Sequence, residues 1–242
     1  MADKISAGTY DLNQWLEGGY EKGVITMIAG PAGSGKTNFA LLVSCSQAKK
    51  GNKIIFVDTE GGFSVDRVKQ IVGESYKEIL NSIFLLEPTS FEELKKDFSR
   101  LLEQVKKEHV SLIVIDGIAM LYRLELGDAI NLKEDDKIKE VNREVAKQMR
   151  SLAEIARKQK IPIIITNQVY AGFLSEEEWK KGVKKEMNLV GGDLFKYWSK
   201  CIIELKNSGG KRKAVLLKHR SLQKKEFNFE IKNTGVFRKR WI

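Results

Sequence analysis

Short apolar runs recur along the 242-residue chain and alternate with longer stretches that have helical periodicity. The runs, all rich in β-branched residues, are 24–29, 53–58, 82–87, 110–116 and 161–167. An apolar run without alternation is typical of a strand that is covered on both faces. The pattern therefore predicts an α/β fold in which strand–helix units build a mainly parallel central sheet.

The stretches between the runs carry helix signals. We expect a helix over 37–50 that ends before Gly51, because glycine is favoured just beyond a helix end. Ser90 and Glu93 form a capping box for a second helix, which should reach about Glu108. A third helix is expected to bury one apolar stripe, made of Ile138, Val141, Val145, Met149, Leu152 and Ala156.

The pattern changes after the last of these strands. Residues 169–192 are polar, contain glycine and are longer than an ordinary connection, which is typical of a functional loop. Farther on, 200–206 and 211–218 flank a glycine turn and predict an antiparallel β-hairpin. A strand at 227–231 should follow, and its alternation places Phe227, Phe229 and Ile231 in the core, with a base-stacking surface as the alternative.

The composition fits a globular protein, since 42% of the residues are hydrophobic and only three are proline. We expect one domain over 1–242, with a lead-in at 1–22. No apolar run approaches the ~18 residues that span a bilayer, and the first residues lack the pattern of a secretory signal. Cys45 and Cys201 lie far apart in apolar segments, so reduced thiols, a cytoplasmic location and no membrane contact are expected.

The net charge of +10 is concentrated at one end of the chain. Residues 206–242 carry 12 basic and 2 acidic groups, which leaves 30 of each in the preceding 205 residues. A basic block of this kind is typical of a surface that binds a polyanion such as DNA. The alternative is a solvated face that serves solubility.

A glycine-rich loop follows the first apolar run and supplies the first candidate chemistry. It consists of Gly30, Pro31, Ala32, Gly33, Ser34, Gly35, Lys36, Thr37 and Asn38. Between a strand and a helix, this spacing is typical of a loop whose backbone N–H groups hold nucleotide phosphates. Lys36 is expected to reach the β- and γ-phosphates, and Thr37 to supply a hydroxyl to Mg²⁺.

Three more polar side chains follow the carboxyl ends of expected strands, where ligands bind in such sheets. Asp116 is the expected partner of Mg²⁺. Glu60 is placed to orient or deprotonate the water that attacks the triphosphate, although a solvated turn acid is the alternative. Gln168 directly precedes the polar loop, so a contact to the γ-phosphate would couple that loop to the nucleotide.

The nucleotide is expected to be ATP rather than GTP. Residues 58–61, Asp-Thr-Glu-Gly, imitate the D-x-x-G motif of GTPases. A GTPase also needs an Asn-Lys-x-Asp sequence that recognises guanine. The one Asn-Lys pair, at Asn52 and Lys53, lacks the acid and lies in the wrong place.

In this order and spacing, the motifs resemble the RecA/Rad51-type ATPase core. They are the glycine loop, Thr59-Glu60-Gly61 after a strand, the apolar strand that ends in Asp116, and Thr166-Asn167-Gln168. The lead-in is similar to that of archaeal RadA and eukaryotic Rad51 proteins. The stretches GPAGSGKTN, VDTEG, LYRLEL and LLKHRS resemble in particular the archaeal RadB group of small RadA paralogues, and the resemblance covers nearly the whole chain.

The resemblance implies a RecA-like core and a slow ATPase that acts in DNA repair and recombination beside a RadA-type recombinase. Single-stranded or branched DNA would be its nucleic-acid partner. Catalysis would fall to Glu60, γ-phosphate sensing to Gln168, and DNA contact to loops at 117–127 and 169–192. The candidate DNA contacts are Arg123, Lys180, Lys181, Lys184, Lys185, Lys211, Arg212 and Lys213.

The chain also departs from those recombinases. Only 29 residues precede Gly30, and they contain neither a helix-hairpin-helix domain nor a Phe-x-x-Ala polymerisation segment. Filament assembly is therefore not implied, and the resemblance leaves open whether the protein is a homo-oligomer. Gly117 stands where relatives usually have serine, and Ser64 where they often have an adenine-stacking arginine, which predicts weaker nucleotide binding.

Two alternatives stay open at the sequence level. Lys218 and Arg220 resemble the Lys-x-Arg strand by which hexameric ATPases reach a neighbour's γ-phosphate, but they would suit DNA phosphates equally. The alternative function is a KaiC-like regulatory ATPase or autokinase that acts through protein association. A metabolic kinase is disfavoured, because the sequence has no recognisable acceptor pocket or lid.

Overall fold

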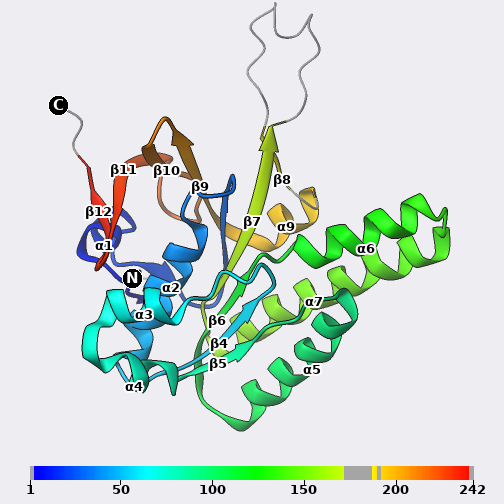
Figure 1. Ribbon diagram of the computed structural model, residues 1–242, viewed down its shortest axis with the longest axis horizontal. Helices are drawn as coiled ribbons and strands as arrows, with labels where there is room; N and C mark the ends of the chain where they lie inside the picture. The colour runs from blue at the N-terminus through cyan, green and yellow to red at the C-terminus, as the bar shows by residue number, and fades with distance from the viewer. Residues whose placement is uncertain (1–2, 172–186, 190–191, 240–242) are drawn as a thin grey trace, which may run out of the picture.

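A ten-stranded sheet runs through the computed structural model, which describes residues 3–171, 187–189 and 192–239 (Figure 1). The strand order is β12-β11-β10-β9-β3-β7-β6-β4-β5, and β8 pairs with β7. Every pair from β9 to β5 is parallel, whereas β8, β10, β11 and β12 pair antiparallel. The predicted α/β fold with antiparallel C-terminal strands is confirmed.

The strands of the parallel part begin and end close to the apolar runs. They are β3 (Ile25–Gly30), β4 (Lys53–Asp58), β5 (Ile83–Leu86), β6 (Val110–Asp116), β7 (Ile163–Ala171) and β9 (Ser199–Ser208). The antiparallel strands are β8 (Met187–Leu189), β10 (Lys211–Lys218), β11 (Lys225–Lys232) and β12 (Gly235–Arg238). In the lead-in, β1 (Lys4–Ile5) and β2 (Tyr20–Glu21) form a separate antiparallel pair.

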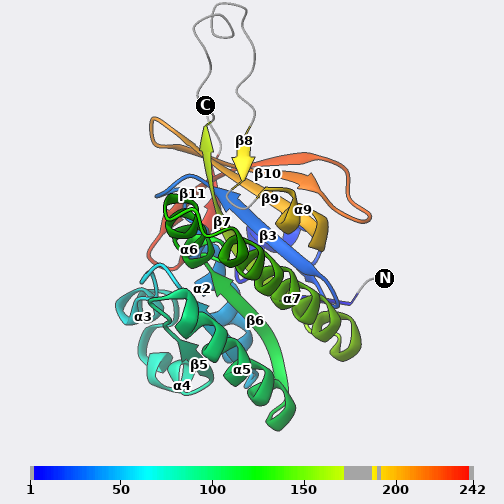
Figure 2. The ribbon, with the colours of Figure 1, turned by 90° about the vertical axis from the view of Figure 1, so that its right-hand side faces the viewer.

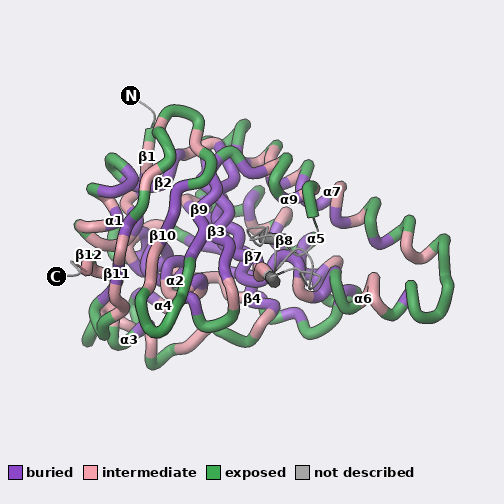
Figure 3. The backbone as a smooth tube through the Cα atoms, turned by 90° about the horizontal axis from the view of Figure 1, so that it is seen from above, coloured by how far each residue is buried: buried purple, intermediate pink, exposed green. Residues whose placement is uncertain are grey.

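Helices cover both faces of the sheet, which gives three layers (Figure 2). One face packs on α5 (Phe91–Lys107), α6 (Met120–Asn131), α7 (Asp135–Gln159) and α9 (Asp193–Trp198). The other packs on α1 (Tyr10–Trp15), α2 (Lys36–Ala48), α3 (Val65–Val72) and α4 (Tyr76–Leu80), with the 3₁₀ turn η1 (Gly73–Ser75) between the last two. Figure 3 shows that the central strands are buried along most of their length, as their continuous apolar sequences predict.

The basic C-terminal strands are part of the core. Phe227 stacks on Trp15 with ring centroids 5.4 Å apart, and Phe229 meets Phe39 of α2 edge to face at 5.3 Å. Both β11 phenylalanines are buried, which confirms their predicted core position. The positive charge of this segment therefore lies on strands that the core holds in place.

Two local predictions need correction. The residues 120–127, predicted to be part of a DNA loop, begin helix α6, because they are good helix formers and pack Leu121 and Tyr122 inward. Tyr122 also donates a hydrogen bond from its hydroxyl to Asn142 Oδ1 on α7, at 2.8 Å. The prediction of a loop over 169–192 is wrong at 169–171 and 187–189, which pair as the end of β7 and β8, and 172–186 lie outside the described residues.

The capping box at the start of α5 is present in an altered form. Ser90 Oγ accepts a hydrogen bond from the Glu93 backbone N–H, as predicted. The Glu93 carboxylate, however, accepts its bonds from the N–H and hydroxyl of Thr89, one residue earlier than in the standard box.

Replacing Phe229 by alanine tests whether the C-terminal strands belong to the cooperative core. The side chain is 1% exposed, so Phe229→Ala should lower the free energy of unfolding by about 3–5 kcal/mol. Denaturant unfolding followed by circular dichroism would measure the change. Tyr197→Ala is the control, because that ring is 69% exposed and its loss should cost less than ~0.5 kcal/mol. If the wild type showed a separate unfolding transition of the C-terminal strands at lower denaturant concentration, these strands would not belong to the cooperative core.

Candidate nucleotide site

The glycine loop joins the carboxyl end of β3 to the start of α2, as the sequence predicts. Gly35 is the N-cap residue of α2 and has φ = 108°, a left-handed conformation that favours glycine. No side chain caps this helix, so its first backbone N–H groups are left to bind another acceptor. A helix start of this kind is suited to hold phosphate oxygens.

Lys36 lies over the loop rather than in solvent. Its ammonium donates hydrogen bonds to the carbonyl oxygens of Gly30 and Pro31, each at 3.2 Å. Burial lowers the pKa of Lys36, while the charges of Glu60 and Asp116 act to raise it. These two carboxylates thus support a buried cation at the centre of the site.

Asp116 is the most buried charged group at this edge of the sheet, with 0% exposure. Its Oδ1 accepts a hydrogen bond from the Thr166 hydroxyl, whereas its Oδ2 has no hydrogen-bond partner by geometry among the described residues. Burial raises the pKa of Asp116, and the hydroxyls of Thr166 and Thr37 act to lower it. An unsatisfied buried carboxylate oxygen indicates that this group serves a ligand.

The residues here fit a magnesium ion. A Cβ atom at Gly62 would lie 3.3 Å from Thr37 Oγ1 and 3.7 Å from Asp116 Oδ2, so both oxygens border one small space beside the loop. Hard oxygen ligands from one or two side chains are the donors that Mg²⁺ uses next to phosphates. No cluster of three or more His, Cys, Asp or Glu side chains suited to a metal occurs in the described part of the chain.

Glu60 is held in position by the turn that follows β4. Asp58 Oδ1 accepts from the Glu60 backbone N–H at 3.1 Å, and Asp58 Oδ2 accepts from that of Phe63 at 2.7 Å. Glu60 Oε1 in turn accepts a hydrogen bond from Gln168 Nε2 at 3.2 Å. The two side chains come from different strands, so the predicted convergence at this edge is present.

Gly117 is required by the backbone at the end of β6. It has φ = 86°, and a Cβ atom there would lie 2.4 Å from Thr59 Oγ1 and 2.6 Å from Glu60 Cγ. The Thr59 hydroxyl donates to the Gly117 carbonyl at 2.8 Å, which fixes this close approach. The glycine at this position therefore lets the Glu60 turn pack tightly against β6.

A cavity of about 470 Å³, here called the carboxyl-edge cavity, lies beside the glycine loop, and Asp116 lies behind Thr37 rather than in its lining. It is lined by Ala32, Gly33, Gly35, Lys36, Thr37, Asn38, Glu60, Gln168, Arg212 and Ile231. Eight of the ten were predicted from the sequence as nucleotide or catalytic residues. The other two, Arg212 and Ile231, come from β10 and β11 in the basic C-terminal segment.

Arg212 was predicted to contact DNA, but the structure places it in the wall of the carboxyl-edge cavity. Its Nε atom is buried and has no hydrogen-bond partner in the described part of the chain. Ile231 lies beside it, since a Cβ atom at Gly35 would be 2.8 Å from Ile231 Cδ1. The period-two pattern of β10 was the available signal, because Arg212 falls in register with the buried Phe229.

Arg67 ties the C-terminal strands to α2. Its Nε donates to Asn38 Oδ1 at 2.8 Å, and its terminal nitrogens donate to the carbonyls of Lys232 and Asn233 at 2.9 Å. Ser64 accepts a hydrogen bond from the Arg67 backbone N–H through its side chain and caps α3. Arg67, which the sequence did not single out, therefore fixes the outer wall of the site.

Arg123 lies near the catalytic candidates rather than on a separate loop. It is an exposed residue on α6, and it lines a small hollow together with Glu60 and Gln168. Lys211 and Lys213 lie on β10, and Lys213 pairs with Glu226 at 2.7 Å. The remaining DNA candidates, Lys180, Lys181, Lys184 and Lys185, lie outside the described residues.

Lys218 and Arg220 lie at the opposite edge of the sheet from the glycine loop. They follow the carboxyl end of β10, which runs antiparallel to β9 and therefore ends beside the amino end of β3. Lys218 Nζ donates to the Lys196 carbonyl at 3.0 Å, and Arg220 Nε pairs with the buried Glu21 at 2.9 Å. Neither reaches the carboxyl-edge cavity of its own chain, so contact with a γ-phosphate would need a neighbouring copy.

Similarity to known proteins agrees with this geometry. A model of the Rad51 family matches residues 2–239. The chain is 40% identical to the DNA repair and recombination protein RadB of Methanobrevibacter smithii, over 93% of this chain and 92% of that protein. It is 38% identical to the protein of the same name from Methanosphaera stadtmanae (93% and 92%) and 37% identical to that from Methanocaldococcus jannaschii (93% and 98%). The resemblance to the RadB group is confirmed, and the chain belongs to the Rad51 family.

Proposed function

We propose that this protein binds ATP, hydrolyses it slowly, binds DNA and assists a RadA-type recombinase in repair and homologous recombination. The carrying observation is that Lys36, Glu60 and Gln168 line one cavity, with the buried Asp116 close enough to affect the charge of Lys36. Members of the Rad51/RecA family are ATPases, and the similar proteins are named for DNA repair and recombination. The KaiC-like alternative has no comparable support.

The chemistry assigned to the chain follows from its donors and acceptors. The N–H groups at the start of α2 and the Lys36 ammonium would bind the phosphates. Thr37 and Asp116 would hold Mg²⁺, which supplies Lewis-acid stabilisation of phosphate charge. Glu60 would accept a proton from the attacking water, and Gln168 would hold the Glu60 carboxylate in position through their hydrogen bond.

The position of Arg123 supports a link between DNA and hydrolysis. Its side chain borders the same hollow as Glu60 and Gln168, and it is carried by α6 instead of a flexible segment. A DNA phosphate that binds Arg123 would change the electrostatic field at Glu60 directly. Arg123 is therefore proposed as the residue through which DNA alters hydrolysis, and no filament is required for this effect.

Two substitutions separate ATP binding from hydrolysis. Lys36→Ala should weaken ATP binding by ~100-fold or more, because a buried charge-assisted contact is lost. Glu60→Gln should leave ATP affinity within about threefold but lower turnover by ~10²–10⁴, since the amide cannot accept the proton. Calorimetric titration with ATP and a phosphate-release assay measure the two effects. Normal turnover in Glu60→Gln would remove that residue from its proposed role.

Arg212 is proposed to bind the triphosphate from the chain's own C-terminal strands. Arg212→Gln should weaken ATP binding by ~10- to 100-fold, because its buried Nε would no longer donate to an anionic ligand. Lys213→Gln is the matched control, because it removes the same charge from the next residue of β10. The Lys213 side chain pairs with Glu226 and does not line the carboxyl-edge cavity. The ATP affinity of this control should stay within about threefold. Equal affinities for both variants would rule out a specific contact by Arg212.

DNA binding is tested by titrating a labelled oligonucleotide at several salt concentrations, with and without ATP. For a single strand, the slope of log affinity against log salt should be about −0.7 per neutralised phosphate, so four to six contacts give roughly −3 to −4. Binding that is undetectable, or that does not respond to salt, would contradict the proposed DNA function.

A further inference from the structure

A second and larger cavity, here called the amino-edge cavity, lies at the other end of the sheet and has a volume of about 1010 Å³. It is lined by Gly23, which precedes β3, and by Lys160, which precedes β7. The glycine loop, in contrast, follows the carboxyl end of β3. The amino-edge cavity is therefore separate from the proposed ATP site.

The lining of the amino-edge cavity is strongly basic. Its cations are Lys22, Arg150, Arg157, Lys158, Lys160 and Arg220, and its only acids among the described residues are Asp3 and Glu154. Lys22 pairs with Asp3, Lys158 with Glu154, and Arg220 with Glu21. The other three cations, Arg150, Arg157 and Lys160, form no ion pair in the described part of the chain.

Unpaired like charges around one cavity repel one another, so they do not stabilise the fold. None of these three side chains is buried, and the apolar side of α7 is already provided by other residues such as Met149 and Leu152. The cluster is thus unexplained by packing. An anionic ligand would turn its repulsion into attraction.

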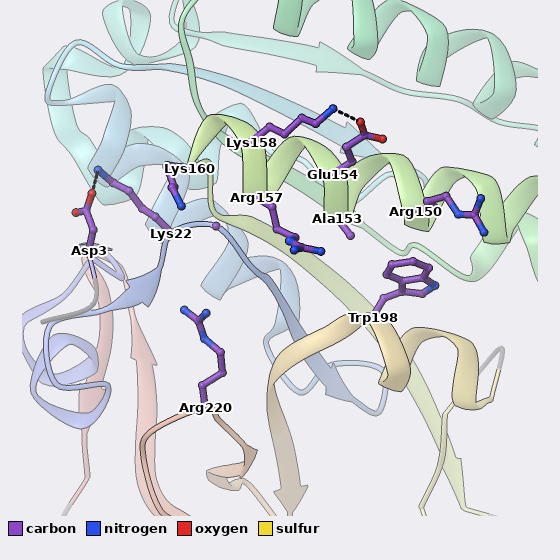
Figure 4. Close-up of a pocket in the computed structure, with 11 residues that line it drawn as sticks. Asp3, Lys22, Arg150, Ala153, Glu154, Arg157, Lys158, Lys160, Trp198 and Arg220 are labelled. Atoms are coloured by element: carbon purple, nitrogen blue, oxygen red, sulfur yellow. Dashed lines mark hydrogen bonds and ion pairs between the residues drawn. The ribbon is translucent and has the colours of Figure 1, made fainter.

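The geometry of the cluster indicates a linear ligand. A spacing of seven places Arg150 and Arg157 on one face of α7, about 10 Å apart along the helix at 1.5 Å per residue. Lys160, the C-cap residue just beyond the end of α7, lines the same cavity and continues the row. Figure 4 shows that Arg157 and Arg220 approach the cavity from opposite sides, the second from the segment after β10. One phosphate group would be bound by donors that converge on a single point. A row of cations with Arg220 facing it can instead bind several phosphates in succession, as in a nucleic-acid backbone.

Aromatic rings continue the surface beyond the row of cations. Trp198 lines the cavity, and Tyr197 beside it has its ring centroid 5.3 Å away and is 69% exposed. Lys200 Nζ lies 5.6 Å from the Tyr197 ring centroid. Exposed aromatic rings next to cations form the stacking platforms that single-stranded nucleic acids use.

We propose that the amino-edge cavity binds the backbone of a single-stranded nucleic acid, with its phosphates along α7 and a base stacked on Tyr197. The proposal rests on the proposed DNA function and adds a surface at the opposite edge of the sheet from Arg123 and from the turn of the β9–β10 hairpin. It also assigns Arg220 to nucleic-acid phosphates, held in place by its ion pair with buried Glu21. An acidic polypeptide would match the charge but would not use the exposed ring.

The test is a charge-neutralising triple variant, Arg150→Gln with Arg157→Gln and Lys160→Gln, in the full chain. Binding of labelled oligothymidine, followed by fluorescence anisotropy, should weaken by at least about tenfold, and the salt slope should become shallower by about 2, since three phosphate contacts are lost. The matched control removes the same charge from exposed positions on α5 through Lys96→Gln, Lys106→Gln and Lys107→Gln. Its salt slope should stay within about 0.5 of that of the wild type.

A second variant tests the stacking contact. Tyr197→Ala should weaken binding of oligothymidine by about tenfold and leave binding of an abasic oligomer unchanged, because only the former has bases to stack. An equal loss for both oligomers would overturn the proposed stacking. Because the ring is exposed, the variant should fold normally.

The remaining outcomes separate this inference from the proposed function. If the wild type binds no DNA, both fail. If the wild type binds DNA but the triple variant keeps the wild-type salt slope, only the amino-edge proposal fails. The same holds if the α5 control loses as much DNA affinity as the triple variant. A loss of ATP turnover that depends on protein concentration, with the DNA slope unchanged, would instead show that the cavity faces the nucleotide of a neighbouring copy. The amino-edge proposal would also be overturned if the wild type bound duplex DNA or poly-glutamate more tightly than oligothymidine and the triple variant lost that binding.

Discussion

The buried carboxylate of Asp116 is the constraint on which the site depends. Its Oδ1 accepts from Thr166 of β7, its own carbonyl accepts from the Thr59 N–H after β4, and the Gly117 N–H donates to the Thr166 hydroxyl at 2.8 Å. These bonds tie the carboxyl ends of three adjacent strands together. A charge buried this deeply is costly unless a cation balances it, so Lys36 and a divalent ion are its natural partners.

This network explains why Glu60 and Gln168 meet although 108 residues separate them. The Thr59 hydroxyl donates to the carbonyls of Asp116 and Gly117, which fixes the direction in which Glu60 follows β4. Gln168 lies two residues after Thr166 on β7, so both side chains are on the same face of that strand. Parallel strands that end at one edge bring distant residues together, and the turn after β4 then sets the position of Glu60. The meeting of Glu60 and Gln168 is therefore set mainly by the sheet, and side chains carried by strands are positioned more precisely than those on long loops.

The parts of the site that the sequence predicts are those set by local chain geometry. The glycine loop, Asp116, Glu60 and Gln168 each follow a recognisable strand, and strand ends in a parallel sheet share one edge. Arg212 and Ile231 reach the site because β10 and β11 pair beside α2, and Arg67 reaches it from α3 through its bond to Asn38. The alternation of β10 indicates which of its residues share a face, but it does not indicate which strand β10 pairs with or which cavity that face borders. The same limit applies to α6, where a resemblance to a loop outweighed strong helix formers.

The placement of the C-terminal charge decides how the protein can use it. A flexible basic tail would bind a polyanion anywhere, but core packing through Phe227 and Phe229 holds these strands in one orientation. One end of β10 then delivers Arg212 to the carboxyl-edge cavity, and the segment after its other end delivers Arg220 to the amino-edge cavity. Arg212 lies on β10 itself, whereas Arg220 lies two residues beyond its end and is held by the buried Glu21. Because β10 is hydrogen-bonded to both β9 and β11, the sheet positions one cation at each of its edges.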